Sequence, residues 1–394
     1  MGKDLADHLI ARGHRVTAIA SRSIYGRSGA TLPKRQTIDG IEIHRVGASL
    51  FGRSNLIARA ADFALFYLLA GLRLLLIPRP DAVVAFTTPP FIALLGLVTR
   101  ALRSSRAVYW VMDLYPAVPI ACGVMSPRSP ITRLFSFLGR HLLRRSDAVV
   151  VLGRCMRRRA LDLGADPERV HLIRVWALDA DLSPVPREKN ALRRQWNADD
   201  RFVVMYSGNF GIAHEARTIL GAVELLRNDD RIRFEFVGGG KRRDEVERAI
   251  RDRNLTNAAW REYQPRERLA ESLSVGDVHL VSIRSGLEGL IVPSKLFGIM
   301  AVARPVLYVG SPESEIARIV EEAGCGMLFQ EGDSSGLARA IQSLADDRGR
   351  AEALGTAGRE ALIGRYDAGT ACSAWSALLE CITARDPSPK AAIR

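Results

Sequence analysis

The feature that most constrains the fold is a regular alternation of short β-branched runs with helical stretches along nearly the whole chain. In the first half, the strand-like runs are HRVTAIA, IEIHRV, DAVVAFTT, RAVYWVMD and DAVVVL. In the second half they are FVVMYSGNFG, RFEFVGGGKRR, AAWREYQPR, DVHLVSI, RPVLYVG and CGMLFQEGD. Strands that alternate with helices in this way are typical of parallel sheets wound by crossover helices. The sequence therefore predicts an α/β protein.

The alternation breaks once, at residues 176–188 (WALDADLSPVPRE), where two prolines and three acids interrupt it. We predict two Rossmann-like domains that face a cleft. The N-terminal domain covers residues 1–180 and the C-terminal domain residues 181–365, followed by a helix at 366–385 and a disordered tail at 386–394. Because ligands of such sheets bind at the carboxyl ends of the strands, we expect the site in the cleft.

The chain opens on a helix, although a doubly wound sheet should begin with a central strand and a glycine-rich loop. Leu5, Leu9 and Ile10 have helical spacing, Gly13 stops the helix, and a strand follows from Val16. We therefore expect an N-terminal sheet that lacks its first strand and leaves ladder groups unpaired. Either Met1 is an internal methionine of a longer protein, or the chain is a truncated copy.

The basic excess of the chain lies entirely in its first half. Residues 1–180 hold 26 Lys and Arg against 12 Asp and Glu, whereas residues 181–394 hold 30 against 31. A basic face attracts either nucleic acid or the anionic leaflet of a membrane. No RNP, zinc-finger or helix-turn-helix signature accompanies the arginines, so we expect no nucleic-acid partner and favour an anionic membrane surface.

An apolar helix is predicted at residues 55–77, with Asp62 and Arg73 on one face. An arginine near the bilayer centre would cost roughly 2.5 kcal/mol or more, so we do not expect the helix to span a membrane. It is either a buried domain helix or a lipid contact. Five cysteines without CxxC spacing predict neither a disulfide framework nor a zinc site. We expect a cytoplasmic protein, peripheral on the inner face of the plasma membrane.

Three motifs of the second half predict a phosphate-bearing ligand. Gly208 and Gly211 in YSGNFG allow a tight turn whose backbone amides point at a ligand, and VGGGKRR repeats the arrangement. In EGLIVPSKLFGIM, Ser294 and Lys295 lie in the first turn of a helix. A lysine is disfavoured at this positive end of a helix unless an anion is shared with it. We therefore expect Lys295 to stabilise the charge of a leaving diphosphate.

The ordered series YSGNFGIAHE, FVGGGKRR, YQPR, DVHLVSIRSGLEGLIVPSKLFGIMAVARPVLYVG and EIARIVEEAGCGMLFQEGD resembles the donor-binding half of glycosyltransferase family 4, closest to its WbuB-like branch. DAVVAFTTPP and YWVMDLYP in the first half resemble the same branch. The resemblance implies a GT-B fold and transfer of a hexosyl or N-acetylhexosaminyl group with retention. It also implies a nucleotide-sugar donor, with UDP favoured, a polyprenyl-diphosphate-linked or saccharide acceptor, and no metal or other cofactor.

The chain departs from the family pattern at two positions. Gly298 stands where a ribose-binding glutamate is usual, which leaves Glu288 and Glu315 to bind hydroxyl groups. Ile212 stands where a cation often follows the first glycine loop, and Arg217 or Arg243 would substitute.

Two further residues are candidates for chemistry. Asp113 either orients and deprotonates the acceptor hydroxyl or caps a helix. His214 either donates a hydrogen bond to the donor or caps. The predicted site comprises catalytic Lys295, Asp113 and His214 and donor-binding Gly208, Asn209, Gly211, Gly239, Arg243, Glu288, Ser294 and Glu315.

Other interpretations remain open. The Asp179–Asp181 triplet DAD matches the metal-binding DxD of the other glycosyltransferase fold, but it lies in the proline-bearing linker, so we interpret it as a solvated hinge. A nucleotide-sugar epimerase uses the same pair of domains. A non-catalytic, truncated homologue with a degenerate sugar site is the third possibility.

Overall fold

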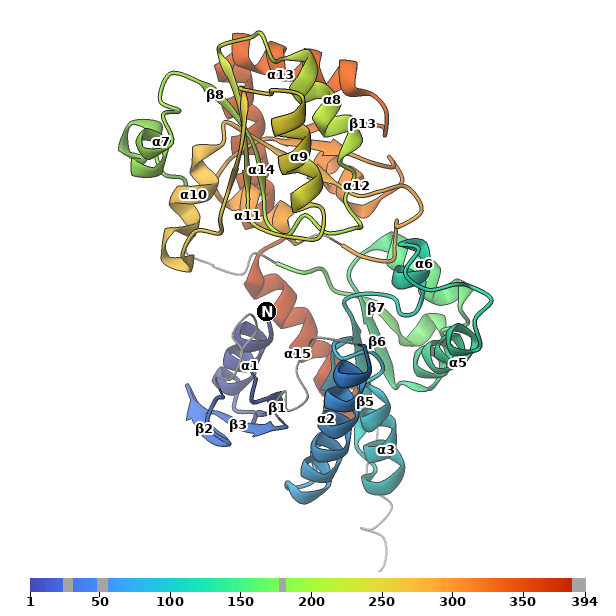
Figure 1. The fold of residues 1–394 in the computed structure, drawn as a ribbon. Helices are drawn as coiled ribbons and strands as arrows, with labels where there is room; N and C mark the ends of the chain where they lie inside the picture. Colours follow the sequence, from blue (N-terminus) through green and yellow to red (C-terminus); the bar gives the residue numbers. More distant parts are fainter. Residues whose placement is uncertain (24–30, 48–55, 177–181, 293, 385–394) are drawn as a thin grey trace, which may run out of the picture.

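The computed structural model describes residues 1–23, 31–47, 56–176, 182–292 and 294–384. The predicted two-domain α/β architecture is confirmed, with parallel sheets in two Rossmann-like halves. Figure 1 shows the C-terminal domain above the N-terminal domain. The DAD triplet and the predicted tail fall outside the described residues.

The C-terminal domain holds one parallel sheet of order β10-β9-β8-β11-β12-β13. Its strands are β8 (Phe202–Ser207), β9 (Ile232–Val237), β10 (Ala258–Arg261), β11 (Val278–Ser282), β12 (Val306–Val309) and β13 (Gly326–Phe329). Its helices are α7 (Ala191–Gln195), α8 (Arg217–Leu225), α9 (Arg243–Asp252), α10 (Leu269–Val275), α11 (Lys295–Ala301), α12 (Glu315–Ala323), α13 (Ser334–Asp346) and α14 (Arg348–Arg365). Strand β11 is buried along its whole length, as expected for a parallel sheet with both faces covered.

The N-terminal domain contains two separate sheets among the described residues. The strands β1 (Thr17–Ser21), β2 (Arg35–Ile38) and β3 (Ile41–Val46) form one sheet, and β4 (Ala82–Ala85), β5 (Arg106–Val111), β6 (Ala148–Val151) and β7 (Val170–Leu172) form the other. The helices are α1 (Gly2–Ala11), α2 (Leu56–Leu76), α3 (Leu94–Arg103), α4 (Ala117–Ala121), α5 (Pro130–Arg145) and α6 (Arg154–Asp162). Edge strands β1 and β4 line one cavity, so the predicted gap lies between them.

The last helix, α15 (Ala368–Ala384), returns to the N-terminal domain and lies beside α1 (Figure 1). Trp375 of this helix is fully buried, and its ring centre lies 4.5 Å from that of Trp110 on β5. Arg12 pairs with Glu380 at 3.0 Å. The chain thus crosses between the domains twice.

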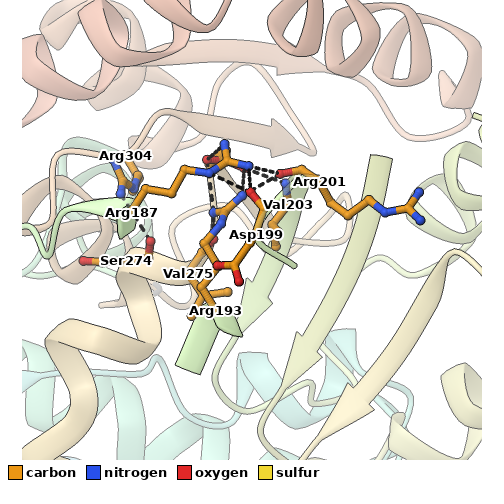
Figure 2. Close-up of polar contacts among 9 residues, drawn as sticks. Arg187, Arg193, Asp199, Arg201, Val203, Ser274, Val275 and Arg304 are labelled. Carbon is orange, nitrogen blue, oxygen red and sulfur yellow. Dashed lines mark hydrogen bonds and ion pairs between the residues drawn. The ribbon is translucent and has the colours of Figure 1, made fainter. Parts of the chain in front are cut away.

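A buried ionic network fixes the linker to the amino ends of the C-terminal strands (Figure 2). Arg193 is fully buried, donates a hydrogen bond to the carbonyl of Val275 at 2.6 Å, and pairs with Asp277 at 2.8 Å. Asp277 also accepts a hydrogen bond from the Val203 amide at 2.7 Å. Arg187 donates to the carbonyl of Arg201 at 2.9 Å. The segment after the prolines therefore belongs structurally to the C-terminal domain.

Candidate active site

Lys295 lies at the first position of α11 and points at the end of β8. Its Nζ donates a hydrogen bond to the Tyr206 hydroxyl and lies 3.8 Å from the centre of the Tyr206 ring. A Cβ atom placed on Gly208 would lie 3.7 Å from Nζ. Burial lowers the pKa of Lys295 to about 7. Among the described residues, no carboxylate lies within ion-pair distance of this ammonium group, so a bound anion would be its natural partner.

The two glycine loops pack backbone against backbone beside Lys295. The Phe210 amide donates to the carbonyl of Gly239 at 2.6 Å, and the Gly208 amide donates to the carbonyl of Val237 at 2.9 Å. Gly240 has a φ of +130°, and a Cβ there would overlap the backbone of Phe210. The glycines of the second loop thus allow the backbone of the first loop to pack directly against them. Asn209, at the tip of the first loop, is exposed.

His214 is buried behind the first loop. Its Nδ1 lies 2.6 Å from the carbonyl oxygen of Ser282, which only accepts, so Nδ1 carries the proton and Nε2 is left as an acceptor. Burial and the neighbouring Lys295 lower the pKa of His214 to about 3, so the ring is neutral at neutral pH. In this tautomer Nε2 can only accept, so toward a nucleotide sugar the histidine would act as a hydrogen-bond acceptor and not as the predicted donor.

Asp113 reaches the C-terminal domain from the end of β5. It forms an antiparallel bridge with Ile291, and the adjacent Leu114 amide donates to the carbonyl of Leu290 at 2.9 Å. This places the backbone of Asp113 directly against the segment that leads into α11. Burial raises the pKa of its carboxyl group. A carboxyl group with a raised pKa is suited to proton transfer.

The two glutamates predicted to bind hydroxyl groups have different surroundings. The Glu288 carboxylate accepts hydrogen bonds from the Gly286 amide at 2.9 and 3.1 Å, and the side chain is partly exposed. The buried Glu315 carboxylate accepts from the Arg154 amide at 2.7 Å and pairs with Arg174 at 3.2 Å. In this arrangement Glu315 joins the two domains, and its oxygens are already occupied, so the structure leaves Glu288 as the available carboxylate.

Arg243, which was predicted to bind the donor, is already paired with carboxylates of the same domain. It pairs with Glu262 at 2.6 Å and with Glu247 at 3.1 Å at the start of α9. The alternative, Arg217, is exposed at the start of α8. Ser294, the residue before α11, is exposed and makes no side-chain cap hydrogen bond.

Two residues that sequence reasoning missed belong to the site. Tyr206 anchors Lys295 and donates a hydrogen bond to the carbonyl of Asn209 at 3.1 Å. Arg284 follows β11, and its guanidinium lies 3.5 Å from the carbonyl of Ile212. Arg284 therefore supplies a positive charge beside the loop position at which Ile212 stands in place of the usual cation. Its place at the carboxyl end of a buried strand was the available signal.

The described residues contain no group of three or more His, Cys, Asp or Glu side chains placed to hold a metal ion.

Family models match both halves of the chain. Residues 3–176 match a glycosyl transferase 4-like domain, and residues 188–361 match the glycosyl transferases group 1 model. A probable glycosyltransferase WbjE of Pseudomonas aeruginosa is 32% identical over 275 residues, which cover 68% of this chain and 67% of the relative. The chain belongs to glycosyltransferase family 4.

One more sequence relative and two solved structures resemble this family 4 glycosyltransferase. The putative colanic acid biosynthesis glycosyl transferase WcaI of Escherichia coli K12 is 26% identical over 62% of this chain and 60% of its own length. The sucrose-phosphate synthase of Thermosynechococcus elongatus superposes with a TM-score of 0.78 at 18% identity, covering 98% of this chain and 93% of that one. Anabaena HepE in complex with UDP-glucose superposes with a TM-score of 0.69 at 15% identity, covering 87% of each chain. The GT-B fold is thereby shown.

Proposed function

We propose that this glycosyltransferase moves a hexosyl or N-acetylhexosaminyl group from a UDP-linked donor to a lipid-linked or polysaccharide-precursor acceptor, with retention at the anomeric carbon and without a metal ion. The observation that carries the donor assignment is Lys295, a partly buried ammonium group that is directed at a glycine loop and has no carboxylate partner in the described part of the chain. The UDP-glucose complex of a protein of this fold supports it. The names of the relatives WbjE and WcaI give the epimerase and the non-catalytic homologue no support.

The proposed roles follow from the geometry. Lys295 and the backbone amides of the first glycine loop stabilise the negative charge that builds on the leaving diphosphate, and Arg284 adds a second cation. His214 accepts a hydrogen bond from a hydroxyl group of the donor through Nε2. Asp113, beside the segment that leads into α11, accepts the proton of the acceptor hydroxyl. Charge neutralisation by fixed cations and amides replaces the role that a divalent ion plays elsewhere.

The surface of the N-terminal domain supports a membrane-bound acceptor. Arg73 of α2 turns inward and donates a hydrogen bond to His44 at 2.7 Å, so the polar face of this helix meets β3. Large exposed apolar side chains lie on α2, α3 and α5, where α3 packs against both of the others: Leu68, Leu72, Leu76, Val98, Leu102, Ile131, Leu134 and Phe137. No helix in the described part of the chain is long and apolar enough to cross a membrane. We propose that this face rests on the anionic inner leaflet of the plasma membrane.

The test of the function combines binding and turnover. Calorimetry against UDP-, GDP- and dTDP-sugars is expected to show binding of the UDP series, and release of UDP should require an acceptor. EDTA is expected to leave the rate unchanged. A strict metal requirement would contradict the metal-independent mechanism, and sugar isomerisation without any acceptor would point to an epimerase.

A further inference from the structure

A cavity of about 310 Å³ lies at the amino ends of the C-terminal strands. It is bounded by linker residues 184–188, by Phe202 at the start of β8, by residues 303–305 ahead of β12 and by the first turns of α14. We call it the linker cavity. Gly208 follows the opposite end of β8, six residues from Phe202, so at about 3.3 Å per residue the two lie roughly 20 Å apart. The linker cavity is therefore separate from the candidate donor site.

Arg304 lines the linker cavity together with Arg187 (Figure 2). It donates a hydrogen bond to the carbonyl of Ser274 at 3.2 Å, but its buried Nε has no hydrogen-bond partner among the described residues. No carboxylate in the described part of the chain lies within ion-pair distance of this guanidinium. Burial lowers the pKa of Arg304, although the charges of Asp277 and Glu352 favour its protonated form. Because buried charges in proteins are ordinarily paired, this arginine has the surroundings of an anion-binding residue.

Positive charge exceeds negative charge around the inner carboxylate of the cavity, Asp277. This carboxylate is paired with the buried Arg193 at 2.8 Å and lies 3.8 Å from Arg187. Arg348, at the start of α14, has no ion pair among the residues that the structure describes, and its guanidinium lies 5.8 Å from the centre of the Phe202 ring. One carboxylate thus faces several guanidinium groups, and a bound anion would balance the excess charge.

Two further carboxylates lie toward the mouth of the linker cavity. Glu188 and Glu352 line it with exposed side chains, and neither forms an ion pair within the part of the chain that the structure describes. Carboxylates only accept hydrogen bonds, so these two suit the hydroxyl groups of a ligand and repel further negative charge. The linker cavity thus offers cationic donors within and anionic acceptors at its mouth.

We propose that the linker cavity binds a small sugar phosphate. The phosphate group pairs with Arg304 and Arg348, because guanidinium groups bind phosphate oxygens through charge-assisted hydrogen bonds. The hydroxyl groups of the sugar donate to Glu188 and Glu352 at the mouth. A volume of about 310 Å³ is at the small end of the range for small-molecule sites, about 300–1,000 Å³, which suits one phosphorylated sugar better than a nucleotide sugar. The bound ligand would connect the linker with α14.

Calorimetry on the Lys295→Met protein is the first test, because this variant lacks the cation that is expected to bind phosphate at the donor site. The probe is glucose 6-phosphate, and glucose and inorganic phosphate serve as its two halves. We expect glucose 6-phosphate to bind at least tenfold more tightly than inorganic phosphate, and glucose alone not to bind. Absence of binding would overturn the proposal, and so would equal affinity for the two phosphates, which would indicate an adventitious ion only.

Variants on α14 locate the ligand. Arg348→Gln removes a phosphate-binding cation at an exposed position and should weaken the binding of glucose 6-phosphate about tenfold. The matched control is Arg350→Gln, which changes an exposed arginine two residues further along the same helix and should leave binding unchanged. Equal affinity in the two variants would contradict the assignment of the phosphate group to this cavity.

The mouth of the cavity and the stability of the protein give two further measurements. Glu352→Gln should weaken the binding of glucose 6-phosphate but not that of inorganic phosphate, which has no sugar hydroxyl groups. Glucose 6-phosphate should raise the melting temperature of the wild-type protein, because a ligand that binds only the folded state stabilises it. This rise should be reduced in Arg348→Gln and kept in Arg350→Gln. A rise of the same size in both variants would place the ligand elsewhere and refute the proposal.

Discussion

Nζ of Lys295 lies 3.8 Å from the centre of the Tyr206 ring and donates a hydrogen bond to the Tyr206 hydroxyl. The ring and the hydroxyl hold the ammonium group beside Gly208, in a partly buried site where the residues that the structure describes supply no opposite charge. The tyrosine positions the lysine, and the lysine remains free to bind an anion.

Replacing Lys295 with Ala or Met is expected to raise the activation free energy by about 2–4 kcal/mol, which slows turnover roughly 30- to 1,000-fold. The cause is the loss of a cation at the leaving diphosphate. The melting temperature should stay the same or rise, because removing a buried charge relieves a desolvation cost. Lys189→Ala, which changes an exposed lysine of the linker, is the control and should leave turnover unaffected. A parallel loss of folding and activity would assign Lys295 a structural role.

The pH dependence of UDP binding follows from the lowered pKa of Lys295 (about 7). A diphosphate favours the charged lysine, so binding above pH 7 must take up a proton. We expect the dissociation constant to be flat just below pH 7 and to rise up to tenfold per pH unit above it. Calorimetry in buffers of different ionisation enthalpy measures the proton uptake. The Lys189→Ala protein should show the same slope, whereas Lys295→Met should lose it.

The lowered pKa of Lys295 also makes the stability of the protein depend on pH. The folded-state pKa of Lys295 lies below its ordinary value of 10.5, so the unfolded chain binds more protons between about pH 7 and 10.5. This lysine therefore makes the free energy of unfolding rise with pH across that window. Urea titrations at pH 7 and pH 9 should show the Lys295 contribution as a difference between wild type and Lys295→Met. An identical pH dependence in both proteins would contradict the shift.

Arg193→Met is expected to destabilise the C-terminal domain by about 3 kcal/mol, because Asp277 is left without its principal charge partner in the linker network. For a domain of this size, that corresponds to a fall in melting temperature of roughly 6–12 °C. The matched control is Arg194→Met, which changes the exposed neighbour on α7 and should shift stability by less than about 0.5 kcal/mol. The double variant Arg193→Met/Asp277→Asn should lose less than the sum of the single changes. Additive losses would show that the pair is uncoupled.

Membrane binding is expected to depend on both charge and apolar contact. Sedimentation with phosphatidylglycerol vesicles should fall steeply as salt rises, since exposed charges are screened within about 10 Å at 0.1 M. Arg157, Arg158 and Arg159 are exposed on α6 of the same domain, and replacing them with Gln should lower sedimentation further. Binding to phosphatidylcholine vesicles should be weak at every salt concentration.

The apolar part of the membrane contact is tested separately on α5. Leu134→Ser together with Phe137→Ser should weaken the binding that persists at high salt, because both side chains are exposed on the proposed face. Leu225→Ser removes an equally exposed leucine from the C-terminal domain and should change nothing. An equal effect of Leu225→Ser would mean that apolar exposure in general, and not this face, drives sedimentation.

Hydrophobic patterning predicted the buried strands well and the exposed ones poorly. The run IEIHRV coincides with β3. Five strands of the C-terminal sheet lie within predicted runs, and the sixth, β9, begins one residue ahead of its run. Strand β2 (Arg35–Ile38) escaped because RQTI is a short edge strand with polar, exposed side chains and pairs antiparallel. Such a segment has no alternation of apolar and polar residues, so it is identified as a strand only by its pairing with β3.

A site residue could be predicted from the sequence where its side-chain type is unfavourable at its local position. Lys295 at the start of a helix is such a conflict, and the structure places it against the first glycine loop. Tyr206 was missed because a tyrosine inside an apolar strand has the pattern of a residue of the hydrophobic core. Glu315 and Arg243 have a suitable charge and sequence position, but their partners, Arg174 and Glu262, come from distant parts of the chain. Such pairings depend on tertiary packing, which a local pattern does not contain.

The return of α15 to the first domain has a consequence for the order of biosynthesis. Trp110 is made early, but Trp375, which covers it, is made more than two hundred residues later. At a synthesis rate of about 5–20 residues per second, the ribosome needs roughly 13–53 s to travel between them. The domain that is translated first is therefore completed last, and its aromatic core stays uncovered while the other domain emerges and folds.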